Sequence, residues 1–129
     1  MGESNPNQRF TELIVWKQAR LLKLDIYEII KAFPDFEKYE LTSQVRRSIR
    51  SVCSDISEGH GRYTYKDQLH FCVQSRGSLT ETLNHLIDAF DCKYIDAEML
   101  RKLEEKLTNV EKLLNGYITF LRNAGGGQK

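Results

Sequence analysis

The segment from Asp96 to Leu121 reads DAEMLRKLEEKLTNVEKLLNGYITFL. Apolar side chains recur along it at alternating steps of three and four residues, at Leu100, Leu103, Leu107, Val110, Leu114, Tyr117 and Leu121. This spacing places them on one face of an α-helix. Asp96 is a suitable N-cap, and the three glycines at 125–127 are suited to end the helix. The segment therefore predicts a long amphipathic helix that packs its apolar face against other helices.

Three earlier segments show the same helical periodicity. The first covers residues 13–33 and stops before a proline, because proline disfavours helical geometry in the residue that precedes it. The second begins with Thr42 as its N-cap and ends at Gly59-His60-Gly61, where a glycine can adopt the left-handed conformation of a helix stop. The third begins with Thr64 as its N-cap and runs to Cys92.

Four helices joined by short loops predict an all-α fold, a single antiparallel up-down-up-down four-helix bundle. We expect residues 10–123 to form the bundle, 1–9 to be a flexible N-terminus and 124–129 to be a flexible glycine-rich tail. No segment alternates with period two for long enough to predict a strand. The core should include Trp16, Ile26, Ile49, Val52, Ile56, Leu83, Leu103, Leu107 and Val110.

The helices differ in expected length. The last two span nearly 30 residues each, or about 40 Å at 1.5 Å per residue, and the first two are nearer 20 residues. Either the long pair overhangs the short pair, or the loop after Phe33 folds over the exposed end.

The composition is that of an ordinary globular domain. Of 129 residues, 40% are apolar and 29% charged, which fits one folded domain rather than a disordered chain. The 19 basic and 18 acidic residues nearly balance, which excludes a protein held on nucleic acid by bulk charge alone.

The chain start, Met1–Pro6, lacks the basic and apolar regions of a signal peptide. No apolar run approaches the roughly 18 residues of a membrane span, so we expect no membrane association. Cys53, Cys72 and Cys92 are odd in number and form no C-x-x-C pair. We therefore expect a cytoplasmic protein whose three cysteines are reduced and buried.

Enzyme motifs are missing from the sequence. A di-iron bundle needs two E-x-x-H pairs, whereas the chain has one D-x-x-H at Asp67–His70 and a Glu81–His85 pair with a different spacing. No G-x-S-x-G, Walker A or H-E-x-x-H pattern occurs. We expect no catalytic residues, no metal site and no cofactor.

Positive charge is concentrated in residues 42–76, which hold six basic and three acidic residues. The turn at residues 59–64 leads into a helix N-terminus, whose N–H groups can receive a phosphate. The candidate nucleic-acid contacts are Arg46, Arg47, Arg50, Arg62 and Lys66. Two alternatives remain open. The arginines can be ordinary surface residues paired with acids, as Glu58 with Arg62, or they can contact a protein partner.

Arg76 occupies an apolar position of the third helix, seven residues from both Leu69 and Leu83. The following Gly77 costs about 1 kcal/mol relative to alanine inside a helix. A glycine there permits close approach of another backbone, so Arg76, Gly77 and Ser78 predict tight packing or an oligomer interface. The alternative is an arginine that extends its charged end to solvent.

Several motifs occur in a fixed order: Ile14-Val15-Trp16-Lys17-Gln18-Ala19, Phe33-Pro34, Leu41–Ser48, Ile56–Arg62 and Gly77–Glu81. In this the chain resembles the bacterial four-helix bundle family that is encoded in intervening sequences of 23S rRNA genes. The resemblance implies a closed left-handed bundle, assembly into a homopentamer, and binding of structured RNA or other nucleic acid. Related accessory proteins of diversity-generating retroelements bind a reverse transcriptase as well as nucleic acid. The alternative function is therefore a protein-interaction scaffold or accessory subunit.

The apolar residues exceed what one face of each helix needs. The first helix has two apolar rows, and the fourth adds Met99, Leu113 and Phe120 beside its main row. Exposed apolar patches are uncommon on monomers, so we expect a homo-oligomer, with five copies implied by the resemblance. The alternative is a monomer with a thick core. Five copies would also let small basic patches act together.

Overall fold

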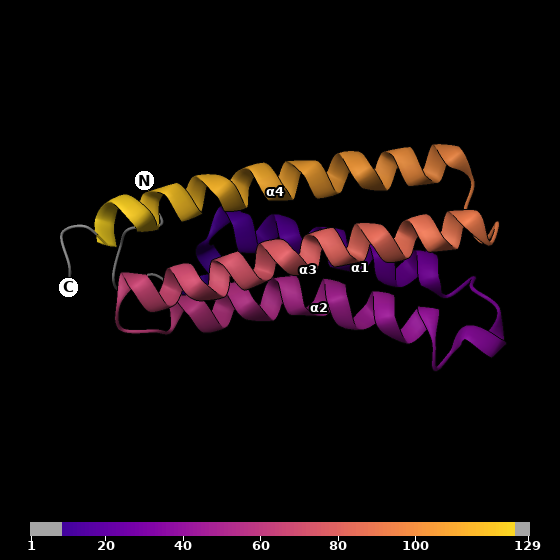
Figure 1. Ribbon diagram of the computed structural model, residues 1–129, viewed down its shortest axis with the longest axis horizontal. Helices are drawn as coiled ribbons and strands as arrows, with labels where there is room; N and C mark the ends of the chain where they lie inside the picture. The colour runs from indigo at the N-terminus through magenta and orange to yellow at the C-terminus, as the bar shows by residue number, and fades with distance from the viewer. Residues whose placement is uncertain (1–8, 126–129) are drawn as a thin grey trace.

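In the computed structural model, residues 9–125 are described, and they confirm an all-α, four-helix fold. The long helices are α1 (Ile14–Ile30), α2 (Leu41–His60), α3 (Tyr65–Asp91) and α4 (Ala97–Gly125). Two short 3-10 helices, η2 (Phe10–Glu12) and η3 (Asp35–Glu37), precede α1 and α2. The long helices lie lengthwise against one another, and successive ones are joined at alternate ends (Figure 1). Most of the two expected tails, residues 1–8 and 126–129, lies outside the described residues.

All four helices contribute to one apolar core. Seven of the nine expected core residues are buried: Ile26, Ile49, Val52, Ile56, Leu103, Leu107 and Val110. The prediction was wrong for Trp16 and Leu83, which are half-buried and pack against the core from its margin. Trp16 contacts Phe10 of η2 edge-on, with ring centroids 5.1 Å apart. A wide apolar face buries its centre fully, and its edges only in part.

Two predicted N-caps are confirmed and one is wrong. Thr64 accepts a hydrogen bond from the Asp67 N–H at 3.1 Å, and Asp96 accepts one from the Met99 N–H at 2.8 Å. Thr42, in contrast, lies inside α2, which begins one residue earlier. The Leu41 N–H there donates to a Glu37 carboxylate oxygen at 3.2 Å. A side chain from η3 therefore takes the capping role expected of Thr42.

The loop after Phe33 folds over the end of the bundle, as one of the two alternatives for the unequal helix lengths requires. Phe33 packs against Tyr94 in the α3–α4 turn, with ring centroids 5.4 Å apart. The Tyr94 hydroxyl donates to the second carboxylate oxygen of Glu37 at 2.7 Å. Glu37 thus caps α2 and ties the α1–α2 loop to the α3–α4 turn.

α2 ends at His60, within the expected Gly59-His60-Gly61 segment, but the left-handed glycine expected there is wrong. No glycine of the described chain has a positive φ, and Gly59 is buried within the helix. A Cβ added to Gly59 would lie 2.8 Å from the Phe71 Cβ and 3.2 Å from the Gln68 carbonyl oxygen. Gly59 is therefore a point of close approach between α2 and α3.

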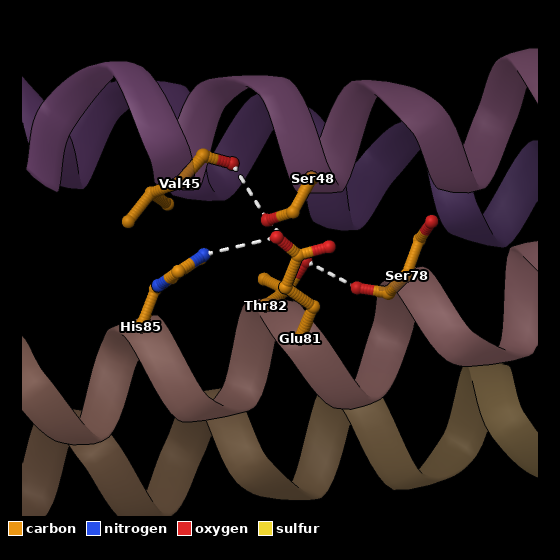
Figure 2. Close-up of polar contacts among 6 residues, drawn as sticks. All are labelled: Val45, Ser48, Ser78, Glu81, Thr82 and His85. Atoms are coloured by element: carbon orange, nitrogen blue, oxygen red, sulfur yellow. Dashed lines mark hydrogen bonds and ion pairs between the residues drawn. The ribbon is translucent and has the colours of Figure 1, made fainter. Parts of the chain in front are cut away.

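Small hydroxyl side chains also lie in the α2–α3 interface. The Ser75 hydroxyl donates to the Val52 carbonyl oxygen, and the Thr82 hydroxyl lies 2.8 Å from the hydroxyl of Ser48. Figure 2 shows Ser48 and Thr82 on facing sides of the two helices. These residues are almost fully buried, so each polar group needs the partner it has.

Cysteine burial matches the expectation at two of three positions. Cys53 and Cys72 are buried and Cys92 is exposed; all three are free thiols. Burial, with a smaller contribution from Asp55, raises the pKa of the Cys72 thiol to about 12. Cys92 lies just after α3, where its side chain faces solvent rather than the core.

Candidate nucleic-acid interface

The outer face of α2 carries a shallow polar depression of about 560 Å³. It is lined by three arginines and three serines: Ser43, Arg46, Arg47, Arg50, Ser51 and Ser54. We call these residues the arginine face. All three arginines are exposed. Residues three and four apart lie on one side of a helix, which explains why this part of the sequence forms one face.

The charge of the arginine face is not balanced by nearby acids. Arg47 and Arg50 form no ion pair with any residue between 9 and 125. Asp55, four residues after Ser51, forms no ion pair with these arginines, and its charge contributes to the raised pKa of the Cys72 thiol on α3. Burial, followed by the nearby charge of Glu58, raises the pKa of Asp55 itself. The arginines of the face are therefore held by no ion pair with a described acid.

Arg46 contacts α1 as well. Its guanidinium lies 5.2 Å from the centre of the Tyr27 ring, and the Lys23 ammonium lies 5.9 Å from the same ring. Sequence reasoning missed Lys23 and Tyr27, because nothing in the sequence links Tyr27 to Arg46. The contact depends on how α1 packs against α2.

Arg62 is already engaged. It pairs with Glu58 at 2.9 Å, and its guanidinium lies 4.7 Å from the centre of the Phe71 ring. Its carbonyl oxygen also accepts a hydrogen bond from the Gln68 amide at 3.1 Å. The pairing with Glu58 is the ordinary surface ion pair that the sequence left open as an alternative for Arg62.

The five candidate residues fall into two groups. Arg46, Arg47 and Arg50 lie in the first half of α2, and Arg62 and Lys66 lie beyond its end at His60. Arg50 and His60 are ten residues apart, or about 15 Å along the helix. Lys66 is exposed in the first turn of α3. The structure brings the first group together and leaves the second apart from it.

The candidate interface at Arg76, Gly77 and Ser78 has two different parts. Arg76 donates to the Asn115 side-chain oxygen at 3.1 Å and so joins α3 to α4. A Cβ added to Gly77 would meet no described atom within 4 Å. The Ser78 carbonyl oxygen accepts from Thr82 within α3. Contacts inside the described chain therefore account for Arg76 and do not account for Gly77.

An apolar groove runs between α1 and α4. A cavity of about 200 Å³ is lined mainly by apolar residues of both helices: Ile14, Val15, Lys112, Leu113, Gly116, Tyr117 and Phe120. We call these residues the α1–α4 groove. Ile14 is 52% exposed and Leu113 38% exposed. Of the three surplus residues expected on α4, Leu113 is exposed, while Met99 and Phe120 are half-buried against the core.

The Glu81–His85 pair joins a buried histidine to an exposed glutamate on α3. The His85 Nε2 lies 3.3 Å from a Glu81 carboxylate oxygen (Figure 2). Its Nδ1 is buried and has no hydrogen-bond partner in the described part of the chain. Within residues 9–125, no three histidine, cysteine or acidic side chains are grouped as a metal site requires. Over the same range, no helix is both long and apolar enough to cross a membrane.

Comparison with known families accounts for most of the chain. The model of the family described as 23S rRNA-intervening sequence protein matches residues 11–116. The chain belongs to this family. The match confirms the resemblance carried by the motifs of the first three helices. The residues that match the family model include the whole arginine face, the turn after α2 and Gly77.

A solved structure has the same fold. It is the crystal structure of a protein with unknown function from the S23 ribosomal protein family of Bacteroides thetaiotaomicron. The two chains are 21% identical and superpose with a TM-score of 0.75 over 81% of this chain and 98% of that one. No curated protein matches this chain.

Proposed function

We propose that this protein is a non-enzymatic, oligomeric binding module that holds structured RNA or another nucleic acid on the arginine face of α2. The observation that carries the proposal is the cluster of three exposed arginines and three serines, in which none of the arginines has an acidic partner in the described chain. Guanidinium groups bind phosphate through paired hydrogen bonds, and serine hydroxyls add further donors. The family name refers to 23S rRNA, so a structured RNA is the first nucleic acid to test.

Assembly into a ring would reconcile a nearly neutral chain with nucleic-acid binding. We expect a homopentamer, in which five arginine faces act on one ligand and raise its effective affinity. Two features support contacts between copies: the apolar α1–α4 groove and the open surface at Gly77. Light scattering at micromolar concentration tests this expectation. A mass near five times 15.0 kDa supports the pentamer, and a mass near 15.0 kDa refutes assembly.

The binding test uses a fluorescent RNA hairpin and measures anisotropy over a range of salt concentrations. Arg46→Ala with Arg47→Ala should weaken binding and lower the dependence of log affinity on log salt, by about 0.9 for each duplex phosphate that is no longer neutralised. The matched control is Arg101→Ala with Lys102→Ala, an exposed basic pair on α4. If the α2 variant binds like the control, the arginine face is not the site.

The alternative is a scaffold or accessory subunit, for example of a reverse transcriptase, that binds protein without reading nucleic acid. The α1–α4 groove favours it, because an apolar groove is suited to a partner helix. Purification from native cells with and without nuclease separates the two functions. A protein partner that stays bound after nuclease treatment, and that no longer binds the Leu113→Asp variant, supports the scaffold.

The buried, free Cys53 and Cys72 fit the expected cytoplasmic location.

A further inference from the structure

Basic residues of α1 lie beside the arginine face, although no sequence pattern connects them with it. Lys23 and Arg46 both approach the Tyr27 ring, from α1 and α2 respectively. Burial raises the pKa of Cys53 on α2, and the charges of Lys23 and Arg20 oppose that rise. Arg20, Lys23 and Tyr27 follow one another by three and four residues, so they lie on one side of α1, the side that contacts Arg46. Cys53 follows Arg50 by three residues on α2.

The nearby acids of α1 pair with other lysines. Asp25 of α1 pairs with Lys106 of α4 at 2.7 Å, and Glu28 pairs with Lys31 at 2.7 Å. Across the described residues, no ion pair involves Arg20, Lys23 or Arg46. Uncompensated positive charge thus continues across the seam between the two helices.

Resting on the function proposed above, we infer that Arg20 and Lys23 of α1 join Arg46 and Arg50 of α2 in one two-helix strip that binds the phosphodiester backbone of a nucleic-acid stem without reading its bases. Tyr27 is a positioning residue in this strip, because its ring holds Lys23 and Arg46 on either side of the seam.

The dimensions of the strip suit a backbone. Arg20 and Tyr27 are seven residues apart, which is about 10 Å along α1. One strand of a duplex carries a phosphate about every 3.4 Å of helix axis, so the strip meets about three phosphates. The aromatic ring of the strip is already engaged by two cations, which favours contacts with phosphates over stacking on a base. Contacts limited to phosphates position a ligand and carry no sequence information.

The test uses two labelled RNA hairpins with stems of equal length and different sequence. The measured quantity is the salt slope, by which we mean the dependence of log affinity on log salt concentration. Arg20→Gln with Lys23→Gln should lower the salt slope by about 2, because two fewer phosphates are neutralised. Arg101→Gln with Lys102→Gln removes the same charge from α4 and should leave the slope unchanged. Arg20→Lys with Lys23→Arg keeps both charges and should restore binding. Circular dichroism of each variant shows that the bundle remains folded.

The outcomes separate this inference from the function on which it rests. If the unmodified protein binds neither hairpin, the proposed function fails and the strip fails with it. If the protein binds, Arg46→Ala with Arg47→Ala lowers the slope, and Arg20→Gln with Lys23→Gln does not, only the strip is overturned. A tenfold difference in affinity between the two hairpins overturns recognition of the backbone alone. For Tyr27, the Phe variant should keep the slope of the unmodified protein and the Leu variant should lower it.

Discussion

Alanine substitution at two helical glycines should change stability in opposite directions. Gly59 and Gly77 both lie inside helices, where alanine is favoured over glycine by about 1 kcal/mol. At Gly77 the new methyl group meets open space, so Gly77→Ala should raise the free energy of unfolding by about that amount. At Gly59 it meets the Phe71 Cβ at 2.8 Å and a backbone oxygen of Gln68 at 3.2 Å.

Neither neighbour of Gly59 can move without moving α3. Forcing extra atoms into a packed interface costs about 1–3 kcal/mol. Gly59 is the penultimate residue of α2, so its gain in helix propensity is at most that of Gly77. The difference between the two variants therefore reports mainly this packing cost. Urea unfolding followed by circular dichroism measures this packing cost. It appears as a separation of the two unfolding midpoints, while the dependence of the free energy of unfolding on urea concentration is the same in both variants.

Equal midpoints for the two variants would refute the reasoning, because they would show that α2 and α3 do not approach each other at Gly59. A less stable Gly77→Ala variant would point to a different cause. No described atom of the same chain opposes a methyl group at Gly77, so a destabilisation that grows with protein concentration places a second copy against that surface.

Individual residues lead to four further predictions. Thr64→Ala should lower the free energy of unfolding by about 1 kcal/mol, measured by urea unfolding, because the Asp67 N–H loses its acceptor; Thr119→Ala, at an exposed position of α4, is the control. The hydrogen bond to Glu37 raises the pKa of Tyr94, so ultraviolet titration should show one tyrosine ionising late, and Glu37→Gln should return it toward 10.0. Cys92 should react with a thiol reagent in the folded protein, whereas Cys53 and Cys72 should react only after unfolding. Because Cys72 keeps its proton in the folded state at pH values where the unfolded thiol has released it, its contribution to stability should fall between pH 9.0 and about 12, and Cys72→Ala should remove that part of the decline.

Features that depend on one helix at a time were predictable from the sequence. The period of three and four residues indicated all four helices, and the caps at Thr64 and Asp96 were local patterns. The grouping of Arg46, Arg47 and Arg50 also follows from spacing on a single helix. Such patterns need no knowledge of neighbouring elements.

Features that depend on how two helices meet were not predictable. Gly59-His60-Gly61 was correctly interpreted as the end of the helix, but the approach of Phe71, which is what requires glycine at position 59, could not be predicted. Glu37 replaces Thr42 as the cap of α2 only because η3 folds back on the helix. The contact of Tyr27 with Arg46 likewise forms only once α1 is packed on α2.

The close approach at Gly59 also restricts how the bundle can move. If α2 slid by one turn along α3, the side chain of Asp55 would occupy the position where only glycine fits against Phe71. The Ser75 hydroxyl would at the same time move away from the Val52 carbonyl oxygen. Sliding of this hairpin is therefore opposed, and we expect α1 to open from α4 more readily, because the groove between them is incompletely filled. Amide hydrogens of α1 should consequently exchange with solvent before those in the middle of α2 and α3.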